Sequence, residues 1–248
     1  MPPSLHRWFF LLFLSFNLSG HLSAQPPKYQ DSGKDSLSGY IQMKYGLDQE
    51  LYNGFQYYKR YVNYKGDPFF PEDVFYDGSI TIRGIEYDYV RLKYNSYSQF
   101  LVLEYTDFKG RYNQMRLSSI HIDSFQLGDY GFQKLSLLGE EPLFYQVFSA
   151  GTLTCYIHWA KDIHATSDDL QYSYEYTKAL GNYYVSYGEE VRTFNNRKSF
   201  ISLFPDPVQG EIKKYFRSHS LSFREAGPGD IQKLIEYVSQ VEETLSEH

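Results

Sequence analysis

Short runs of β-branched and aromatic residues alternate with turn residues along most of this chain. The stretch 78–118 shows the pattern best and predicts strands at 79–83, 86–94, 99–106 and 112–118, separated by turn signals. This spacing suits hairpins and leaves no room for crossover helices between the strands. We therefore expect neighbouring strands to pair in the antiparallel direction.

Similar runs continue along the chain, and further strands are expected at 120–127, 132–135, 143–149, 152–159, 172–178, 183–187 and 191–194. Together the runs predict a mainly β domain over residues 40–197, an antiparallel β-barrel or β-sandwich of roughly ten strands. Patterning alone does not separate these two architectures. An outer-membrane barrel is not expected, because its strands of about ten residues would carry an apolar face toward lipid.

Two loop signals stand before the main run of strands. Asn53-Gly54 is a turn dipeptide, so a strand is expected after it. The sequence 66–71, Gly-Asp-Pro-Phe-Phe-Pro, breaks any regular element because it holds two prolines. We expect Phe69 and Phe70 to plug one end of the β core.

The pattern changes to helical after Asn196. Asp206 and Pro207 form a helix start, with Asp as the cap and Pro at the first helical position. A second start lies at 228–230, and apolar residues then follow at spacings of three and four: Ile231, Leu234, Ile235, Val238 and Val241. Residues 198–248 are therefore predicted to be a helical segment packed on the β domain.

The first 24 residues have the pattern of a secretion signal. His6 and Arg7 precede the apolar run 8–16, and Ala24 is suited to cleavage. The apolar run is too short to span a bilayer, and no Cys stands near the cleavage point to carry a lipid. Residues 25–39 are polar and are expected to be a linker. The sequence thus predicts Sec export to the periplasm or outside the cell, with no lipid anchor and no transmembrane span in the mature chain.

Composition narrows the classes of partner. The chain has 19 % aromatic residues, including 26 Tyr, which favour strands. Its formal net charge is -6 and it has no basic block, which argues against a nucleic-acid partner. It has a single cysteine, Cys155, so an internal disulfide is excluded.

Two groups of sequence phrases carry a family resemblance. The first comprises Leu51-Tyr52-Asn53-Gly54, Lys65-Gly66-Asp67-Pro68-Phe69-Phe70 and Gly78-Ser79-Ile80-Thr81; the second runs from Ser199-Phe200-x-x-Leu203-Phe204 through Glu211-Ile212-Lys213-Lys214-Tyr215 to Asp230-Ile231-x-Lys233-Leu234-Ile235. With these phrases the chain resembles a group of uncharacterised secreted β-rich proteins of Gram-negative bacteria that end in a helical segment. The phrases consist of turn and packing residues. The resemblance therefore implies a fold and export, and it transfers no functional residues.

Cys155 and His158 are the first candidates for chemistry. In a strand over 152–159, Cys155 shares a face with Leu153, Ile157 and Trp159, while His158 points to the other face. A thiol in apolar surroundings is unreactive because its pKa is raised. We therefore expect Cys155 to be a structural residue.

The remaining titratable clusters lack the spacing that catalysis or metal binding requires. The richest set of metal-ligand types lies on a strand end and a loop: His158, Asp162, His164, Asp168 and Asp169. It matches no zinc motif. His121 and Asp123 form a His–Asp pair without a nucleophile-elbow serine. The acidic doublets Glu140-Glu141 and Glu189-Glu190 precede strands at expected turn positions, and two adjacent residues of a strand would point to opposite faces, so neither doublet alone supplies a carboxylate pair across a cleft. We predict no catalytic residue, no metal site and no cofactor, while carboxylates from distant strands could still converge.

The predicted binding surface is one face of the strand 86–94. If Val90 and Leu92 face the core, the side chains that face outward are Tyr87, Tyr89, Arg91 and Lys93. Tyr beside Arg is typical of binding surfaces. The alternative is that Tyr covers the solvated face of the sheet simply because its β propensity is high.

The sequence favours an exported, non-catalytic protein of the cell envelope that binds another envelope protein or helps its assembly. One alternative is a binder of a small ligand, lipid or glycan that uses the β domain. A second alternative is a hydrolase whose site the sequence does not reveal, which would need perturbed carboxylates or histidines in one cleft.

Overall fold

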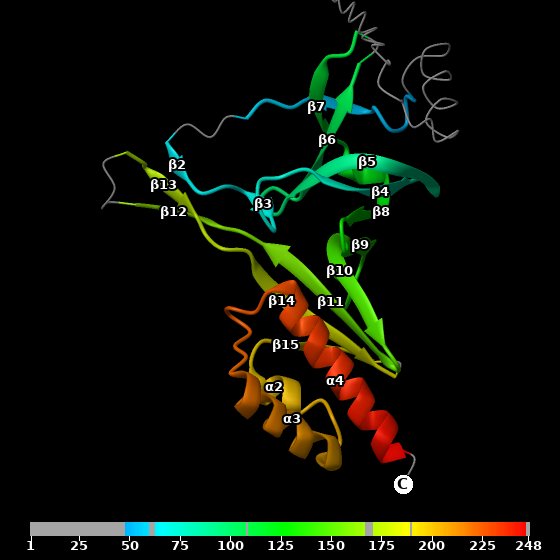
Figure 1. The fold of residues 1–248 in the computed structure, drawn as a ribbon, viewed down its shortest axis with the longest axis vertical. Coiled ribbons are helices and arrows are strands. Elements are labelled where there is room, and N and C mark those ends of the chain that lie inside the picture. The colour runs from blue at the N-terminus through cyan, green and yellow to red at the C-terminus, as the bar shows by residue number, and fades with distance from the viewer. Residues whose placement is uncertain (1–47, 60–62, 108, 167–170, 189, 247–248) are drawn as a thin grey trace, which may run out of the picture. The chain divides into compact units, whose positions relative to one another are not determined.

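The computed structural model describes residues 48–59, 63–107, 109–166, 171–188 and 190–246, which all belong to one compact unit, Gln42–His248 (Figure 1). The predicted signal peptide and linker lie outside the described residues and stay predictions. The strand expected after Asn53-Gly54 is present as β1, and the four strands predicted in 78–118 are β4 to β7.

The strands in chain order are β1 (Gly54–Gln56), β2 (Tyr64–Lys65), β3 (Phe69–Phe70), β4 (Tyr76–Ile82), β5 (Ile85–Asn95), β6 (Phe100–Thr106), β7 (Tyr112–Leu117), β8 (Ile122–Leu127), β9 (Tyr130–Leu135), β10 (Leu143–Ala150), β11 (Leu153–Ala160), β12 (Ile163–Ala165), β13 (Tyr174–Tyr176), β14 (Leu180–Tyr187) and β15 (Glu190–Phe194). The helical elements are the 3-10 turn η1 (Ser119–His121) and the helices α2 (Arg197–Ile201), α3 (Asp206–His219) and α4 (Pro228–Ser246).

Twelve strands form one large sheet with the order β1-β7-β6-β5-β4-β8-β9-β10-β11-β14-β15, and β3 pairs with β5 beside this path. Its strand pairs are antiparallel. A second sheet has the order β12-β13-β2, and the Tyr64 ring of β2 stacks 5.3 Å from the Tyr174 ring of β13. The mainly antiparallel β class with a C-terminal helical segment is confirmed.

The barrel alternative does not hold for the described strands. The path of the large sheet ends at β1 on one side and at β15 on the other, and no pairing among the described strands joins these two ends. Each end strand has one neighbour among the described strands: β1 pairs with β7, and β15 pairs with β14. The sheet therefore has two edges, which a closed barrel would lack.

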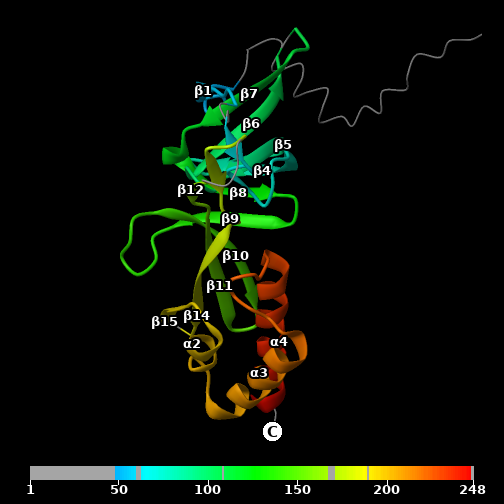
Figure 2. The ribbon, with the colours of Figure 1, turned by 90° about the vertical axis from the view of Figure 1, so that its left-hand side faces the viewer.

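One face of the large sheet carries the main core. Its buried residues come from the strands and the helices alike, for example Leu92 and Ile157 with Phe200, Ile212 and Ile235. The predicted stripe of the last helix is part of it: Ile231, Leu234, Ile235 and Val238 are fully buried, and Val241 is partly buried. Figure 2 shows α2, α3 and α4 gathered beside β14 and β15, with α4 running along β10 and β11.

The starts of the two long helices lie close to the predicted positions. α4 begins at Pro228, as its sequence signal indicates. α3 begins one residue earlier than expected, because Pro205 occupies the cap position and makes no side-chain cap bond. Asp206 thereby lies in the first turn, where its negative charge still favours the positive end of the helix dipole.

Candidate functional site

The face predicted for ligand binding is interrupted by a bulge in β5. Gly78 pairs with Val90 and Ser79 pairs with Asp88, so Tyr89 is an extra residue, and its φ of 58° is left-handed. A bulge shifts the alternation of side chains by one position. As a result, the Tyr87 side chain packs against the main core.

The four predicted residues therefore do not form one exposed face, which corrects the prediction. Tyr89 is 79 % exposed, and Arg91 is half exposed and forms ion pairs with Glu104 and Asp77. Lys93 shares the face of Arg91 but is buried, with 5 % of its surface exposed. Of the four predicted residues, Tyr89 and Arg91 are thus accessible to a partner.

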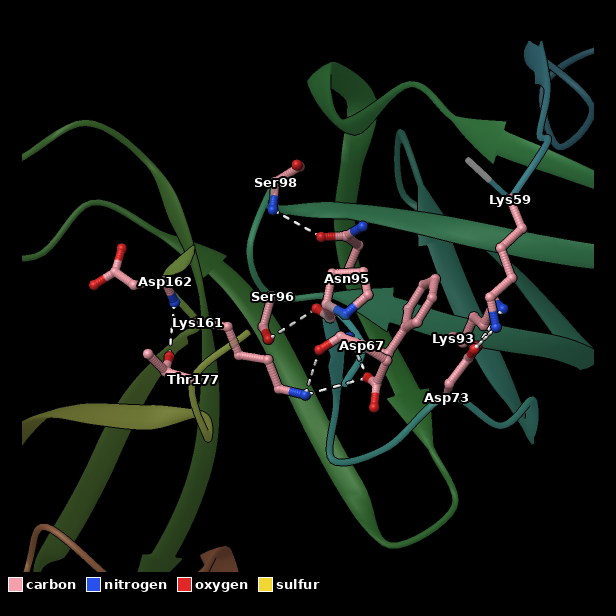
Figure 3. A network of polar contacts seen from close by, with 12 residues as sticks. Lys59, Asp67, Asp73, Lys93, Asn95, Ser96, Ser98, Lys161, Asp162 and Thr177 are labelled. Carbon is pink, nitrogen blue, oxygen red and sulfur yellow. Dashed lines mark hydrogen bonds and ion pairs between the residues drawn. The ribbon is translucent and has the colours of Figure 1, made fainter. Parts of the chain in front are cut away.

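The burial of Lys93 has a specific cause in the loop segment after β3. The Lys93 ammonium lies 2.6 Å from Asp73 Oδ1 (Figure 3). It also lies 4.0 Å from the centre of the Phe69 ring and 4.7 Å from the centre of the Phe75 ring. A cation over aromatic rings and beside a carboxylate is strongly held. Lys93 therefore fixes the segment to β5, and we assign it a structural role.

The Asp73 carboxylate is shared by two lysines. Its second partner is Lys59, whose Nζ lies 2.7 Å from Oδ2. Burial acts to raise the pKa of Asp73, but the hydrogen bonds from Lys59 and Lys93 outweigh it and hold that pKa below its usual range. The carboxylate is thus charged at neutral pH and is not a general acid.

A second buried lysine holds the other end of the same segment. Lys161 Nζ donates to the Asp67 backbone oxygen at 2.9 Å and lies 3.2 Å from Asp67 Oδ1 (Figure 3). The segment between these two clamps places Phe70 in the main core and Phe69 in a separate cluster with Phe100 and Val102. The expectation that both phenylalanines plug one core is therefore wrong, because adjacent strand residues point to opposite faces.

Cys155 is buried and free, as expected. Burial raises the pKa of its thiol, so the thiolate that nucleophilic attack requires is disfavoured. His158 is also buried; its Nδ1 lies 3.1 Å from the Phe144 backbone oxygen, and burial lowers its pKa. Neither residue belongs to an accessible reactive pair.

The other titratable candidates have local structural partners. Asp123 accepts the Gly84 backbone N–H at 2.7 Å and so fixes the β4–β5 turn, and Glu190 forms an ion pair with Arg192. His164 lies 3.9 Å from Glu175. Asp168, Asp169 and Glu189 lie outside the described residues. Within the described ranges, no group of three or more His, Cys, Asp and Glu side chains is arranged to hold a metal ion.

The structure instead draws attention to the β1 edge of the large sheet. Phe55 of β1 is 80 % exposed, Tyr58 just after it is 62 % exposed, and Tyr112 of β7 is 78 % exposed. Tyr57 donates its backbone N–H to Gln114 O at 2.9 Å, so Tyr58 lies at the Tyr112 end of β7. We call Phe55, Tyr58 and Tyr112 the edge aromatics.

The main chain of β1 also offers hydrogen-bonding groups. Asn53 O and Tyr57 N bond to β7, and Phe55 pairs with Arg116. Because backbone bonds alternate between the two sides of a strand, the N–H of Gln56 points away from β7. Among the described strands, β1 has no neighbour on that side. The sequence signalled a strand here, but it could not show that this strand lies at the edge of the sheet.

Comparisons with known proteins add no relative: no family model matches the chain, and neither a curated protein nor a solved structure is similar to it. The resemblance stated from the sequence phrases therefore stays a prediction. Among the described residues, no helix combines the length and apolar character needed to cross a bilayer.

Proposed function

We propose that this protein is an exported, non-catalytic component of the cell envelope that binds another envelope protein along strand β1. The observation that carries the proposal is the edge position of β1: its outward main-chain groups face no other strand among the described residues, and large aromatic side chains beside it are exposed. An extended segment of a partner can add to such an edge as a new strand, with main-chain bonds supplying affinity.

The side chains around the edge suit this mode of binding. Phe55 lies opposite Arg116 in the register, and the Arg116 side chain is exposed and lies over the Phe100 ring at 4.2 Å. Aromatic residues and arginine contribute most to the binding energy of protein interfaces. An added strand would lie beside β1 in the plane of the sheet, so its alternate side chains could contact the edge aromatics.

The non-catalytic part of the proposal has separate support. The buried Cys155 and His158 are inaccessible, and the Asp73 carboxylate is committed to two lysines. The acidic side chains of Asp123 and Glu190 bond to nearby groups of the same chain. These contacts give each group a structural role.

The proposal is tested with a proline in the edge. The Gln56→Pro variant removes an N–H that does not bond to β7, so it blocks strand addition while β1 and β7 stay paired. After mild crosslinking in the cell envelope, the tagged wild type should retain a stoichiometric protein partner that Gln56→Pro loses at least tenfold.

Two further variants make the result specific. Phe55→Glu should also lose the partner, whereas Leu180→Glu should retain it, because Leu180 is 49 % exposed but begins β14, next to β15 at the other end of the sheet. A partner that Gln56→Pro and Phe55→Glu retain at the wild-type level would overturn docking at β1. The absence of any stoichiometric partner of the wild type would overturn the protein-binding function itself.

A further inference from the structure

A cavity lies where the two sheets and the helical segment meet. It measures about 360 Å³, and four parts of the chain line it: the β2–β3 segment, the end of β11 with Lys161, the link between β13 and β14, and the turn that leads into α4. Small-ligand sites are typically clefts of a few hundred Å³, and they form preferentially where separate parts of a protein meet. The place of this cavity in the fold therefore suits a ligand site.

The cavity has apolar walls from all four parts of the chain. They include Pro71, Ala179 and Ala226. The Phe70 ring, which also lines the cavity, stacks 5.0 Å from the ring of Trp159, and both side chains are buried. Large side chains that are closely packed in this way hold the wall in one shape. A preformed apolar wall suits the apolar body of a small ligand.

A buried lysine supplies the main polar group at the cavity. Lys161 lines it and is 8 % exposed. Its Nζ donates to the Asp67 backbone oxygen at 2.9 Å and lies 3.2 Å from Asp67 Oδ1, as Figure 3 shows. An ammonium has three N–H donors, so one of them has no acceptor among the described residues. A buried donor of a charged group is costly without an acceptor, and an acceptor from a ligand would be favourable.

The charges at the cavity favour an ionised oxygen as that acceptor. The Asp67 carboxylate compensates the Lys161 ammonium only in part, because the shorter of the two bonds goes to the backbone oxygen and Oδ1 also accepts the Phe69 N–H at 2.8 Å. The other charged lining residues, Lys178 and Glu225, are exposed and of opposite sign, so solvent screens them. An ammonium bonds most strongly to a carboxylate.

We propose that this cavity binds a small organic carboxylate with an apolar body. The carboxylate accepts the third N–H of the Lys161 ammonium, and the apolar body contacts the wall formed by Pro71, Ala179 and Ala226. This site is separate from the β1 edge, and it does not depend on the proposed protein partner.

Isothermal titration of the purified full-length chain with sodium phenylacetate tests the site. Phenylacetamide is the neutral probe, since it has the same ring and nearly the same shape. Phenylacetate should bind saturably and at least about tenfold more tightly than the amide, because the bond to the ammonium loses its charge assistance with the amide. This comparison needs no variant. Equal affinities for the two probes, or no saturable binding of phenylacetate, would refute the proposal.

Two alanine variants test whether the probe occupies the cavity. Ala179→Phe fills part of the cavity and should weaken phenylacetate binding at least about tenfold. Ala165→Phe is the matched control, since Ala165 is exposed on β12 and does not line the cavity, and it should bind phenylacetate as the wild type does. Unchanged affinity in Ala179→Phe, or an equal loss in both variants, would show that the probe binds elsewhere.

Two lysine variants identify the cation that holds the carboxylate. Lys161→Gln should lower the affinity for phenylacetate about tenfold, to the level of phenylacetamide, whereas Lys178→Gln should change it less than about threefold because that ammonium is exposed. Thermal unfolding checks that both variants fold, and the comparison of the two probes on the wild type decides if Lys161→Gln does not. A larger loss in Lys178→Gln than in Lys161→Gln would contradict the assignment of Lys161.

Discussion

At the β15 end of the large sheet, the Phe194 ring lies 4.9 Å from Phe200 and 5.2 Å from Phe223, and Phe194 is 3 % exposed; at the β1 end, Phe55 is 80 % exposed. Both edges carry a phenylalanine on a short strand. The difference is the helical segment, which follows β15 directly and covers its core-facing side. Natural proteins usually protect an edge strand, because its unpaired main-chain groups can pair with another chain.

The two edge strands also differ in their charged side chains, and charge again protects β15 more than β1. On β15, Glu190 and Arg192 form an ion pair, and charged side chains on an edge strand discourage pairing with other chains. The β1 strand, Gly54–Gln56, has no charged residue. Among the described residues, β15 thus carries charged side chains and a buried Phe194 that β1 lacks, and this difference supports the proposed docking at β1.

The largest expected effect is a change in the free energy of unfolding, which distinguishes a buried phenylalanine beside β15 from the exposed Phe55 on β1. Phe200→Ala should lower the free energy of unfolding by about 3–5 kcal/mol, because it leaves a cavity among the rings of Phe194, Phe204 and Phe216. Phe55→Ala should change it by less than about 0.5 kcal/mol, since its side chain is exposed. Urea unfolding measures both, and a similar cost for the two variants would remove the contrast between the edges.

The ion pair between Asp73 and Lys93 gives the next largest effect on stability. Asp73→Ala should cost about 3 kcal/mol, because it leaves the Lys93 ammonium buried without a counter-charge. Lys59→Ala should cost less than about 1 kcal/mol, because that ammonium is exposed and the Asp73–Lys93 pair remains. If both variants lost the same stability in urea, Lys93 would not depend on Asp73.

The Asp73–Lys93 pair also predicts how the stability of the protein depends on pH. The pKa of Asp73 is lowered in the folded protein, so its contribution is fully present above the unfolded pKa of about 3.9 and is lost as pH falls through the folded pKa. Below pH 4 the wild type should lose stability more steeply than Lys93→Met, in which that contact is absent. Parallel stability profiles of the two proteins between pH 5 and pH 2 would argue against a charged Asp73–Lys93 pair.

The smallest expected effect concerns the bulge at Tyr89. Tyr89→Gly should stabilise the protein slightly, by up to about 1 kcal/mol, because a φ of 58° strains a side chain but not glycine. Little packing is lost, since Tyr89 is 79 % exposed. Thermal unfolding of the variant measures the effect, and a loss above about 1 kcal/mol would mean that the exposed ring makes contacts that hold the bulge.

Local signals predicted the hairpins well, and tertiary contacts decided the rest. Turn residues such as Gly84 and Gly110 marked the ends of β4 and β6, and alternation placed Cys155 and Ile157 on the buried face of β11. The bulge at Tyr89 was missed because a single extra residue leaves no mark in a period-two pattern. The order of strands in the sheet, and hence the identity of its edges, depends on pairings that the pattern does not encode.

The candidate site shows the same limit. Alternation correctly placed Arg91 and Lys93 on one face, but it could not show that Phe69 and Phe75 cover Lys93. Lys is rarely buried unless paired, so exposure was the natural expectation. Phe55 and Tyr112 appeared as ordinary strand residues, and their exposure follows from their place at the end of the sheet.

Site-specific photocrosslinking in living cells tests the central comparison most directly. A photoreactive phenylalanine analogue at position 55 on β1, and in a second strain at position 192 on β15, samples the two edges in the same native environment. The account predicts a discrete adduct with one protein from position 55 and none from position 192. An adduct from position 192 alone, or the same adduct at equal yield from both positions, would contradict the assignment of β1 as the docking edge.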